Sequence, residues 1–187
     1  MDKEQVNKYL KDGSIIRNLM DASKIYEFGI ALSKSFHSGN KLIVMGNGGS
    51  AADAQHIAAE FVGRFERERT PLPALALHSN TSSITAIGND YGFEQIYSRQ
   101  ISAFAKKGDF VLGLSTSGNS ANVIKAFEVS NEIGCDNYGI TGNSGGKMLE
   151  ILGKNNIITI DSNRTSFIQE CTIAIGHILS KIIEDLM

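Results

Sequence analysis

The segment FVLGLSTSGNS, residues 110–120, joins an unbroken apolar run to a loop rich in hydroxyl side chains. An apolar run without polar alternation is typical of a strand that is buried on both faces of a parallel sheet. Four further runs are apolar or rich in strand-forming residues: LIVMG at 42–46, ALAL at 74–77, NYGIT at 137–141 and IITI at 157–160. Most are separated by helical segments long enough to cross over a sheet. The sequence therefore predicts an α/β fold, a three-layer αβα sandwich around a five-stranded parallel sheet.

The first 38 residues show a different pattern. Apolar residues recur there at three- and four-residue spacings, which predicts amphipathic helical structure from residue 1 to about 38. This segment contains no visible catalytic residue. A helical extension with exposed apolar positions on a one-domain chain indicates subunit packing. We therefore divide the chain into N-terminal helices that serve oligomerisation, 1–38, and an α/β domain, 39–187.

The charge balance argues against two classes of partner. The chain has 187 residues, with 18 Lys and Arg against 20 Asp and Glu, so it shows no basic footprint for nucleic acid or an anionic membrane. No apolar stretch approaches the roughly 18 residues of a membrane span, and the polar N-terminus is no secretory signal. The mixed-charge run Arg64–Arg69 (RFERER) is expected to be a solvated helix end. Cys135 and Cys171 have no metal or redox spacing, which fits a cytoplasmic protein.

Glycine is unusually frequent, with 19 residues against only 2 prolines. One group precedes predicted strands, where a helix end needs a left-handed residue: Gly39, Gly108, Gly134 and Gly153. The second group follows strands: Gly46, Gly48, Gly49, Gly118, Gly142, Gly145 and Gly146. Doubly wound folds bind ligands at the carboxyl ends of their strands, so the second group marks a candidate site.

The first of these loops is MGNGGSA, residues 45–51, which opens an alanine-rich helix. Its glycines let backbone N–H groups approach a ligand, and the helix N-terminus adds positive potential. Gly46, Gly48 and Ala51 also match a dinucleotide-binding spacing. That fingerprint needs an acidic residue near the end of the second strand, which instead ends in LHSN at 77–80. A nicotinamide-dependent dehydrogenase is therefore disfavoured.

The second loop, STSGNS at 115–120, has four hydroxyl side chains: Ser115, Thr116, Ser117 and Ser120. Beside the unpaired N–H groups of a helix N-terminus, they would form a cradle of neutral donors for a phosphate dianion. The loop lacks the lysine of a nucleotide-binding P-loop, which favours a single phosphomonoester over a nucleotide. A simple N-cap and turn would use the same residue types, but it explains one hydroxyl rather than four.

Polar residues on two helices are ambiguous from spacing alone. His56 and Glu60 lie four residues apart and thus on one helix face. With Asp53 and Arg64 they also form an ordinary solvated stripe, in which Glu60 and Arg64 would be an ion pair. The helix predicted over 167–186 is apolar nearly all round. Three polar residues interrupt it, Gln169, Glu170 and His177, and they too are open to interpretation as a solvated stripe.

Several motifs, taken together, point to a known family. STSGNS after an apolar strand resembles the sugar isomerase (SIS) family of phosphosugar-binding domains, and the chain resembles the phosphoheptose isomerases within it over about residues 45–180. The resemblance rests on these blocks: Gly46–His56, Ala59-Glu60, Gly63-Arg64, Asn89–Gly92, Gly108-Asp109, Ser115–Ser120, Asn122-Val123, Thr141-Gly142, Gly145-Gly146, Ile168–Glu170 and Gly176–Leu179. The fold that it implies is SIS-type, with a flavodoxin-like topology.

The resemblance implies an aldose–ketose isomerase. The family converts sedoheptulose 7-phosphate to D-glycero-D-manno-heptose 7-phosphate through an enediolate, the first step of nucleotide-activated heptose biosynthesis for lipopolysaccharide or capsule. Moving a carbonyl between C1 and C2 needs a base, an acid and stabilisation of the enediolate. The resemblance implies Glu60 as base and His177 as acid. It also implies one divalent metal per subunit, usually zinc, on four ligands: His56, Glu60, Gln169 and His177.

The same resemblance implies how the substrate is held. Four residues would bind the phosphate: Ser115, Thr116, Ser117 and Ser120. Sugar-binding positions of the family match Asn47, Gly48, Gly49, Asn89 and Asp90, while Glu60 and Gln169 also match substrate-binding positions. The family further implies a homotetramer with active sites at subunit interfaces.

One departure from the family pattern concerns a basic residue. The family commonly has Arg-Ile-Gln-Glu where this chain has Phe167-Ile168-Gln169-Glu170. We hypothesise that Arg164, three residues earlier, covers the missing role, or that the role is dispensable here.

The alternative function is non-catalytic. Some relatives keep the fold as phosphosugar-binding regulators or as replication-initiator-binding proteins. A pure binding protein has no need for the quartet that the family uses for metal binding, so the presence of all four residues favours the enzyme.

Overall fold

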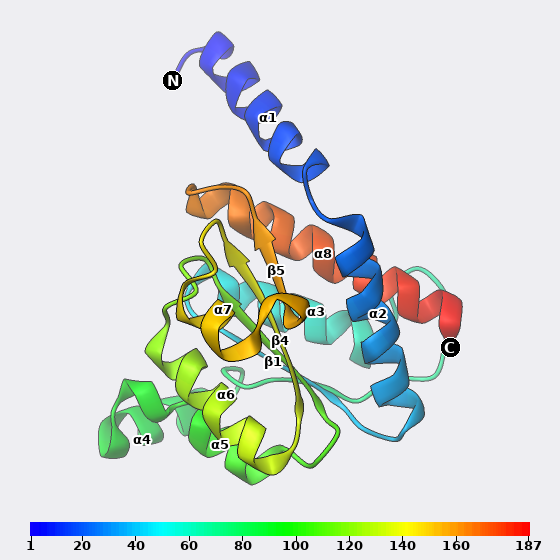
Figure 1. Ribbon diagram of the computed structural model, residues 1–187, viewed down its shortest axis with the longest axis vertical. Coiled ribbons are helices and arrows are strands. Elements are labelled where there is room, and N and C mark those ends of the chain that lie inside the picture. The colour runs from blue at the N-terminus through cyan, green and yellow to red at the C-terminus, as the bar shows by residue number, and fades with distance from the viewer.

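The five predicted strands pair into one parallel sheet in the computed structural model, which describes all 187 residues (Figure 1). The strands are β1 (Leu42–Gly46), β2 (Ala74–Ala76), β3 (Phe110–Ser115), β4 (Asp136–Gly142) and β5 (Ile157–Ile160). Their order across the sheet is β2-β1-β3-β4-β5, which is the flavodoxin-like order and confirms the implied topology. The order reverses between β1 and β3, and folds of this kind bind their ligands outside the carboxyl ends of the strands at that point.

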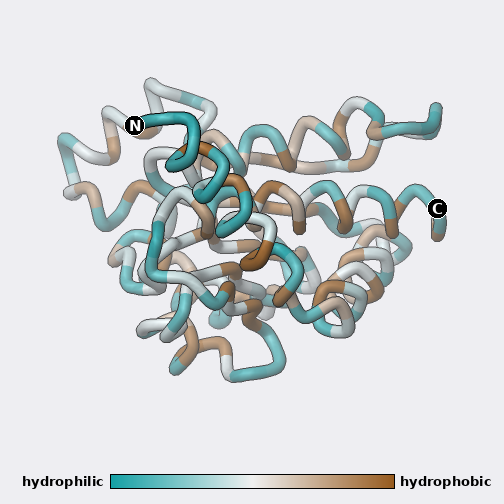
Figure 2. The backbone as a smooth tube through the Cα atoms, turned by 90° about the horizontal axis from the view of Figure 1, so that it is seen from above, coloured by the Kyte–Doolittle hydropathy of each residue, from teal (hydrophilic) through white to brown (hydrophobic).

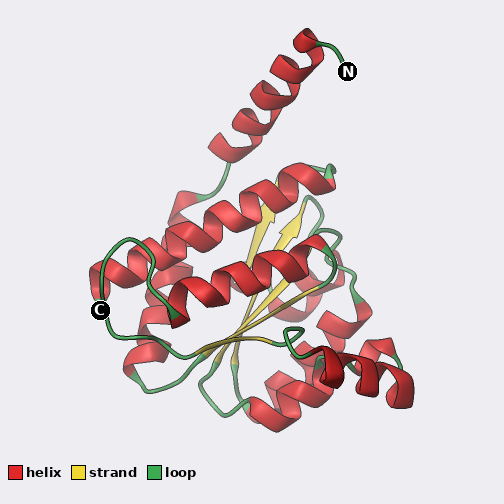
Figure 3. Ribbon diagram, turned by 180° about the vertical axis from the view of Figure 1, so that it is seen from behind, coloured by secondary structure: helices red, strands yellow, loops and turns green.

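Alternate residues of each strand face two separate cores, because side chains along a strand point to opposite faces. In β1, Leu42 and Val44 face the first core, and Ile43 and Met45 face the second. The first core is covered by α2 (Ala22–His37), α3 (Gly49–Val62) and α8 (Thr165–Leu186). The second is covered by α4 (Thr81–Tyr91), α5 (Ser98–Phe104), α6 (Ala121–Ile133) and α7 (Gly146–Leu152). The 3₁₀ turns are η1 (Phe93–Gln95) and η2 (Lys154–Asn156). This arrangement confirms the three-layer prediction (Figure 3).

The N-terminal helical segment divides into two helices with different surroundings. The first, α1 (Lys3–Asn18), has no buried residue and projects away from the domain (Figures 1 and 3). The chain then turns, and the Asp21 carboxylate caps α2 by accepting from the backbone N–H of Lys24 at 3.0 Å. Helix α2 is an integral part of the first core, where Phe28 and Leu32 are each only 1% exposed. Only α1 is therefore an appendage within one copy of the chain.

Hydrophilic and hydrophobic residues alternate along the helices. In Figure 2 the helices alternate between hydrophilic and hydrophobic stretches, as expected for helices that bury one face. None of the helices combines the length and the apolar composition that a membrane span requires.

The glycines before strands have the backbone conformation that the sequence predicted. All four have positive φ: Gly39, Gly108, Gly134 and Gly153. The run Arg64–Arg69 differs slightly from its prediction, because α3 already ends at Val62. The run is a loop that returns over the end of α3, where Arg69 donates to the carbonyl oxygens of Glu60 and Phe61.

The burial of α2 predicts a large difference between two neighbouring substitutions. Phe28→Ala should lower the free energy of unfolding by about 3–5 kcal/mol, because it removes a buried aromatic ring from the first core. Glu27→Ala, on the exposed face of the same helix, should change it by less than about 0.5 kcal/mol. Urea unfolding of both variants provides the measurement. Small effects for both variants would show that α2 is a loosely attached extension.

Candidate active site

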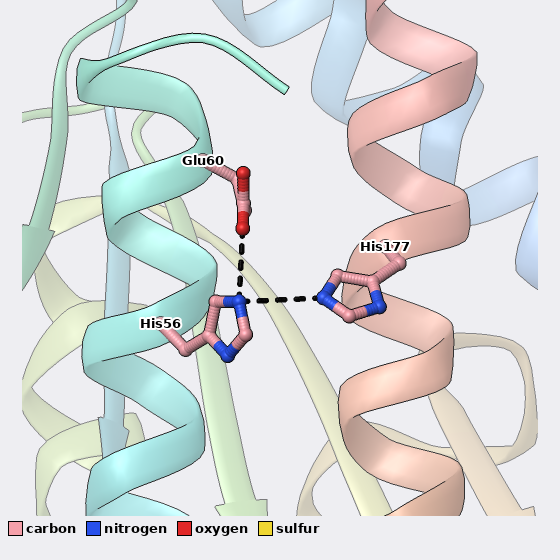
Figure 4. A group of neighbouring side chains, drawn as sticks. All are labelled: His56, Glu60 and His177. Atoms are coloured by element: carbon pink, nitrogen blue, oxygen red, sulfur yellow. Dashed lines mark hydrogen bonds and ion pairs between the residues drawn. The ribbon is translucent and has the colours of Figure 1, made fainter. Parts of the chain in front are cut away.

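Three of the predicted site residues meet between two helices. His56 and Glu60 extend from α3, and His177 extends from α8 beside it (Figure 4). His56 Nε2 lies 2.9 Å from Glu60 Oε1 and 3.4 Å from His177 Nε2. The two imidazole rings meet edge to face, with centroids 5.0 Å apart. Residues 121 positions apart in the sequence thus form one polar cluster, which we call the histidine–glutamate cluster.

Close packing of α3 against α8 makes this cluster possible. Gly176 lies directly on Ile57, where an added Cβ would be 2.5 Å from Ile57 Cγ1. Near the start of both helices, Gly49 lies on Gln169 in the same way, with an added Cβ 2.3 Å from the amide Nε2. These two contacts show that the helices run in the same direction.

The donor atoms of the histidine–glutamate cluster fit a divalent metal. The ligand atoms of all three side chains lie within 4.8 Å of one another. A tetrahedral zinc site with bonds of about 2.0–2.1 Å places its ligand atoms roughly 3.3 Å apart, close to the 3.4 Å between the two imidazole nitrogens. Two imidazoles and one carboxylate are a ligand set that zinc uses in catalytic sites, where a fourth position stays open.

Gln169 does not reach this cluster within one copy of the chain. It precedes His177 by eight residues on α8, which is about 12 Å of helix rise. Its amide lies against Gly49 instead, at the other end of the α3–α8 pair. A single copy therefore divides the four expected metal ligands into a cluster of three and a separate amide.

The surroundings of Glu60 differ from those of an ordinary solvated stripe. Arg64 does not pair with Glu60, and its Nε lies 3.8 Å from the carboxylate of Glu68. The Glu60 side chain is only 18% exposed and faces His56, which is 49% exposed. One turn earlier, burial raises the pKa of Asp53, an effect that the nearby His56 opposes. The polar face of α3 is therefore directed toward α8 as well as toward solvent.

The hydroxyl loop 115–120 does not use its N-cap residue as a cap. Ser120 begins α6 but makes no capping hydrogen bond, and its Oγ pairs with Ser115 Oγ at 2.8 Å. Ser117 Oγ accepts from the backbone N–H of Asn119 at 3.2 Å. Gly118 has φ +67°, and the carbonyl of Gly145 would lie 2.1 Å from an added Cβ. The backbone is thus held close to the neighbouring loop. In the first turn of α6, Ser120 caps no N–H group, and the Val123 N–H donates to Asn122 Oδ1 at 3.0 Å.

A polar pocket of about 340 Å³ adjoins this loop. Of the four predicted phosphate-binding residues, Thr116 and Ser117 form part of its wall, whereas Ser115 and Ser120 do not line it. Five further polar residues of the wall were not predicted as site residues: Asn143, Ser144, Ser162, Asn163 and Thr165. They follow β4 and β5, so the rule that ligands bind at the carboxyl ends of strands could have identified them.

The glycine loop, residues 45–51, is held in place by hydrogen bonds between the side-chain amides of Asn47 and Asn122. The Asn47 and Asn122 side chains donate to each other at 2.9 Å in both directions. The Tyr97 hydroxyl donates to the carbonyl of Gly46 and lies 3.2 Å from Asn47 Oδ1. Burial raises the pKa of Tyr97 to about 12, which keeps this hydroxyl protonated as a donor. Asn122 belongs to α6, so the glycine loop and the hydroxyl loop are tied together.

Two predicted sugar-binding residues lie apart from the rest. Asn89 and Asp90 are exposed near the end of α4, where the Asn89 amide donates to the Asp90 carboxylate at 2.8 Å. Neither residue lines the polar pocket or the histidine–glutamate cluster in one copy of the chain.

Arg164 lies beside the polar pocket, but its guanidinium already has partners. Its Cζ lies 4.2 Å from the ring centroid of Phe167 and 4.9 Å from that of Tyr9 in α1. Its Nη1 lies 3.9 Å from an Asp12 carboxylate oxygen. The same arginine lines a second pocket of about 410 Å³ that shares Ser162 and Asn163 with the first. Its position beside the polar pocket is compatible with the hypothesis that Arg164 replaces the basic residue that the family has at position 167.

The loop after α3 is fastened to the end of α8 by a carboxylate. Glu184 Oε1 accepts from the backbone N–H groups of Phe65, Glu66 and Arg67 at 3.2, 2.9 and 2.9 Å. The Phe65 ring stacks on the His177 imidazole with centroids 5.6 Å apart. Glu184 therefore indirectly positions one member of the histidine–glutamate cluster, a role that the sequence analysis missed because it depends on backbone donors.

Comparisons with known proteins agree on one family. Residues 11–142 match a family model described as SIS domain. The chain is 48% identical over 179 residues to a probable phosphoheptose isomerase of Thermoplasma volcanium, covering 96% of this chain and 90% of that protein. It is 50% identical over 166 residues to a phosphoheptose isomerase of Rhodospirillum rubrum, covering 89% and 87%. A solved structure of a phosphoheptose isomerase from Francisella tularensis superposes with a TM-score of 0.93 at 32% identity, covering 99% and 100%.

The fastening of the loop by Glu184 predicts a pH-dependent stability difference. Desolvation opposes ionisation of Glu184, but the three backbone donors and Lys181 outweigh it and hold its pKa below the ordinary value of 4.5. A carboxylate with a depressed folded pKa stabilises the protein above its unfolded pKa and loses that effect as the pH falls through the folded pKa. Glu184→Gln should therefore be less stable than wild type near neutral pH, and the difference should shrink below about pH 4.5.

Urea unfolding of both proteins across this pH range measures the effect. Asp185→Asn is the control, because Asp185 is half exposed and forms only surface ion pairs, with Arg67 at 3.0 Å and with Lys181 at 4.0 Å. We expect its effect to be small at every pH, since exposed pairs contribute at most about 1 kcal/mol. A stability difference for Glu184→Gln that stays constant with pH would contradict the role of the charge.

Proposed function

We propose that this chain, which belongs to the SIS domain family and within it to the phosphoheptose isomerases, interconverts sedoheptulose 7-phosphate and D-glycero-D-manno-heptose 7-phosphate. The observation that carries the proposal is the histidine–glutamate cluster. His56, Glu60 and His177 come from helices far apart in the sequence and meet at hydrogen-bond distances. A phosphosugar-binding protein without catalysis would need only the hydroxyl loop, so the cluster supports an enzyme.

The reaction moves one proton between adjacent carbons and shifts the carbonyl. Glu60 would act as the base that removes the proton beside the ketone and returns it to the neighbouring carbon. Its Oε1 faces His56, so the second carboxylate oxygen is available toward a substrate. His177 would exchange a proton with the carbonyl oxygens, where charge develops in the enediolate. Phe65, stacked on its ring, would hold the imidazole in one orientation.

The same residues support a divalent metal as cofactor. We propose zinc, one ion per subunit, with His56, Glu60 and His177 as ligands from one copy of the chain. When bound, zinc would supply a Lewis acid that polarises a carbonyl oxygen and stabilises negative charge. Gln169 lies about 12 Å of helix rise from His177, so we propose that the Gln169 ligand comes from a second copy.

The phosphate of the substrate would bind in the polar pocket. Its wall offers neutral hydroxyl and amide groups from three loops, which suits a single phosphomonoester. We assign Ser115, Thr116, Ser117 and Ser120 to this end of the substrate. Asn47, Gly48 and Gly49 would contact sugar hydroxyls, as would Asn89 and Asp90, and Gln169 would contact the substrate as well.

Within one copy of the chain, the polar pocket and Glu60 are too far apart for one substrate molecule to reach both. The polar pocket lies beside Ile168, near the N-terminal ends of α3 and α8. Glu60 follows Gly49 by eleven residues, which is about 16 Å of helix rise. Seven single bonds separate the ketone carbon from the phosphorus, and an extended chain spans only roughly 9 Å over that number of bonds. We therefore propose active sites at subunit interfaces, where one subunit holds the phosphate and another supplies Glu60.

The surface of the chain supports such an assembly. Helix α1 has no buried residue, yet Val6, Leu10, Ile15 and Leu19 on it or just after it are all exposed apolar side chains. Ile178, directly beside His177, is also exposed. These positions are suited to contact other subunits. A homotetramer is the state that we propose, with α1 as an oligomerisation element. The two free, buried cysteines support a location in the reducing cytoplasm.

The function predicts a specific defect in the Glu60→Gln variant. Wild-type protein should convert sedoheptulose 7-phosphate to the aldoheptose phosphate and incorporate deuterium from heavy water, both measurable by NMR. Glu60→Gln should fold normally but lose about 10²- to 10⁴-fold in rate, because a positioned proton transfer contributes that much. Glu68→Gln, on a side chain that is 90% exposed, is the matched control and should be fully active. Undiminished deuterium exchange in Glu60→Gln would exclude Glu60 as the base.

The ligand set predicts the metal content of the purified protein. Mass spectrometry of the metal should find about one divalent ion per subunit in the wild type, and His56→Ala should lose most of it because a first ligand is removed. His37→Ala is the control, since His37 lies on α2 and bonds to the Ser33 carbonyl oxygen at 2.9 Å. Equal metal content in all three proteins would show that the ion binds elsewhere.

A further inference from the structure

A cavity of about 240 Å³ lies at the carboxyl ends of β1 and β2. Asn47 and Gly48 of the glycine loop form one wall, and Thr81 and Thr85 of α4 form another. His78, which follows β2, faces the same space.

His78 has hydrogen-bonding capacity that the protein does not use. Its Nδ1 and Nε2 are both buried and neither makes a hydrogen bond of good geometry, although the ring lies close to the Ala51 backbone. Burial lowers the pKa of His78, an effect that the Ala51 backbone opposes in part, so the ring is neutral at pH 7. A neutral imidazole offers one donor and one acceptor. Leaving a buried polar group unsatisfied costs about 1–3 kcal/mol, so a ligand that bonds both nitrogens would gain from them.

Three of the other polar side chains around the cavity are already engaged, and the remaining one, Thr81, is exposed at the first position of α4. The Asn47 amide is bonded to Asn122, and the Tyr97 hydroxyl donates to the carbonyl of Gly46. The Thr85 hydroxyl donates to the carbonyl of Thr81 at 2.8 Å. His78 is therefore the side chain in this wall best able to recognise a ligand.

The chemistry of the cavity selects one class of group. None of its lining side chains is a lysine, arginine, aspartate or glutamate. Unlike the polar pocket, the cavity also lacks a set of hydroxyl and amide groups from several loops, so a phosphate or carboxylate would lose its hydration there with few hydrogen bonds in return. A hydroxyl group can donate and accept at once, and so it matches a neutral imidazole.

We propose that this cavity is a subsite for the hydroxyl-bearing carbon chain of the phosphosugar, and that His78 binds one of its hydroxyls and determines specificity. The inference rests on the proposed function for the identity of the substrate. Asn47 connects the subsite to the phosphate end, because its partner Asn122 lies two residues after Ser120 of the hydroxyl loop. The phosphate and the carbon chain would thus bind on opposite sides of the glycine loop and the hydroxyl loop, which the Asn47–Asn122 pair links.

Binding of a non-reacting polyol phosphate tests the proposal without requiring catalysis. The probes are D-glucitol 6-phosphate, which has no carbonyl to isomerise, and inorganic phosphate, both measured by isothermal titration calorimetry. Wild type should bind glucitol 6-phosphate more tightly than phosphate. His78→Phe should lose about tenfold or more in affinity for glucitol 6-phosphate, the effect of about one lost hydrogen bond to a buried group, with phosphate affinity unchanged.

Thr85→Val is the matched control, because Thr85 lines the same cavity but its hydroxyl is bonded to its own helix. It should bind both probes as the wild type does. In the wild type, the ring ¹⁵N signals of His78 should also shift with glucitol 6-phosphate and not with phosphate, a readout that does not depend on the folding of any variant.

Three results would overturn the proposal: equal wild-type affinity for both probes, an equal loss for both probes in His78→Phe, or ring signals that do not move. Failure of the proposed function gives a different pattern. In that case glucitol 6-phosphate would bind through His78, while sedoheptulose 7-phosphate would not be converted.

Discussion

The direct contact between α3 and α8 determines where the polar groups of the candidate active site lie. Gly176 has no side chain, so Ile57 packs against the backbone of α8. This close approach allows His177 to reach within 3.4 Å of His56. Because the helices run in the same direction, the end of α8 also meets the loop after α3, where Glu184 binds three backbone N–H groups. The cluster and its support thus depend on one tightly packed helix pair.

The same packing separates the parts of the site. Gln169 and the polar pocket lie toward the start of the helix pair, and Glu60 lies toward its end. Two helices that pack rigidly in one direction cannot bring these ends together. The proposed chemistry therefore requires a second copy of the chain, which the exposed apolar residues of α1 would contact in the proposed assembly. The proposed need for assembly thus follows from the parallel packing of α3 and α8, which also brings the histidine–glutamate cluster together.

Much of the fold could be predicted from the sequence because it depends on local patterns. Runs that are apolar or rich in strand-forming residues predicted all five strands, and positive-φ glycines occur before strands as expected. Spacing did not locate the break between the two N-terminal helices, because the apolar pattern continues across Asp21, whose carboxylate caps the second helix. Spacing showed His56 and Glu60 on one face, but their contact with His177 is tertiary and was implied only by family resemblance. His78 had no signal, since its significance comes from the cavity that surrounds it.

Complementation between two inactive variants tests the shared site most directly. Glu60→Gln lacks the base, and Thr116→Val combined with Ser117→Ala lacks hydroxyls of the phosphate pocket. Each protein alone should be nearly inactive on sedoheptulose 7-phosphate. After unfolding and joint reassembly at equal amounts, about one quarter of the sites should combine an intact phosphate half with an intact Glu60, so activity should return toward one quarter of wild type. Mixed assemblies that form, as native mass spectrometry would show, but stay inactive would contradict an active site built from two subunits.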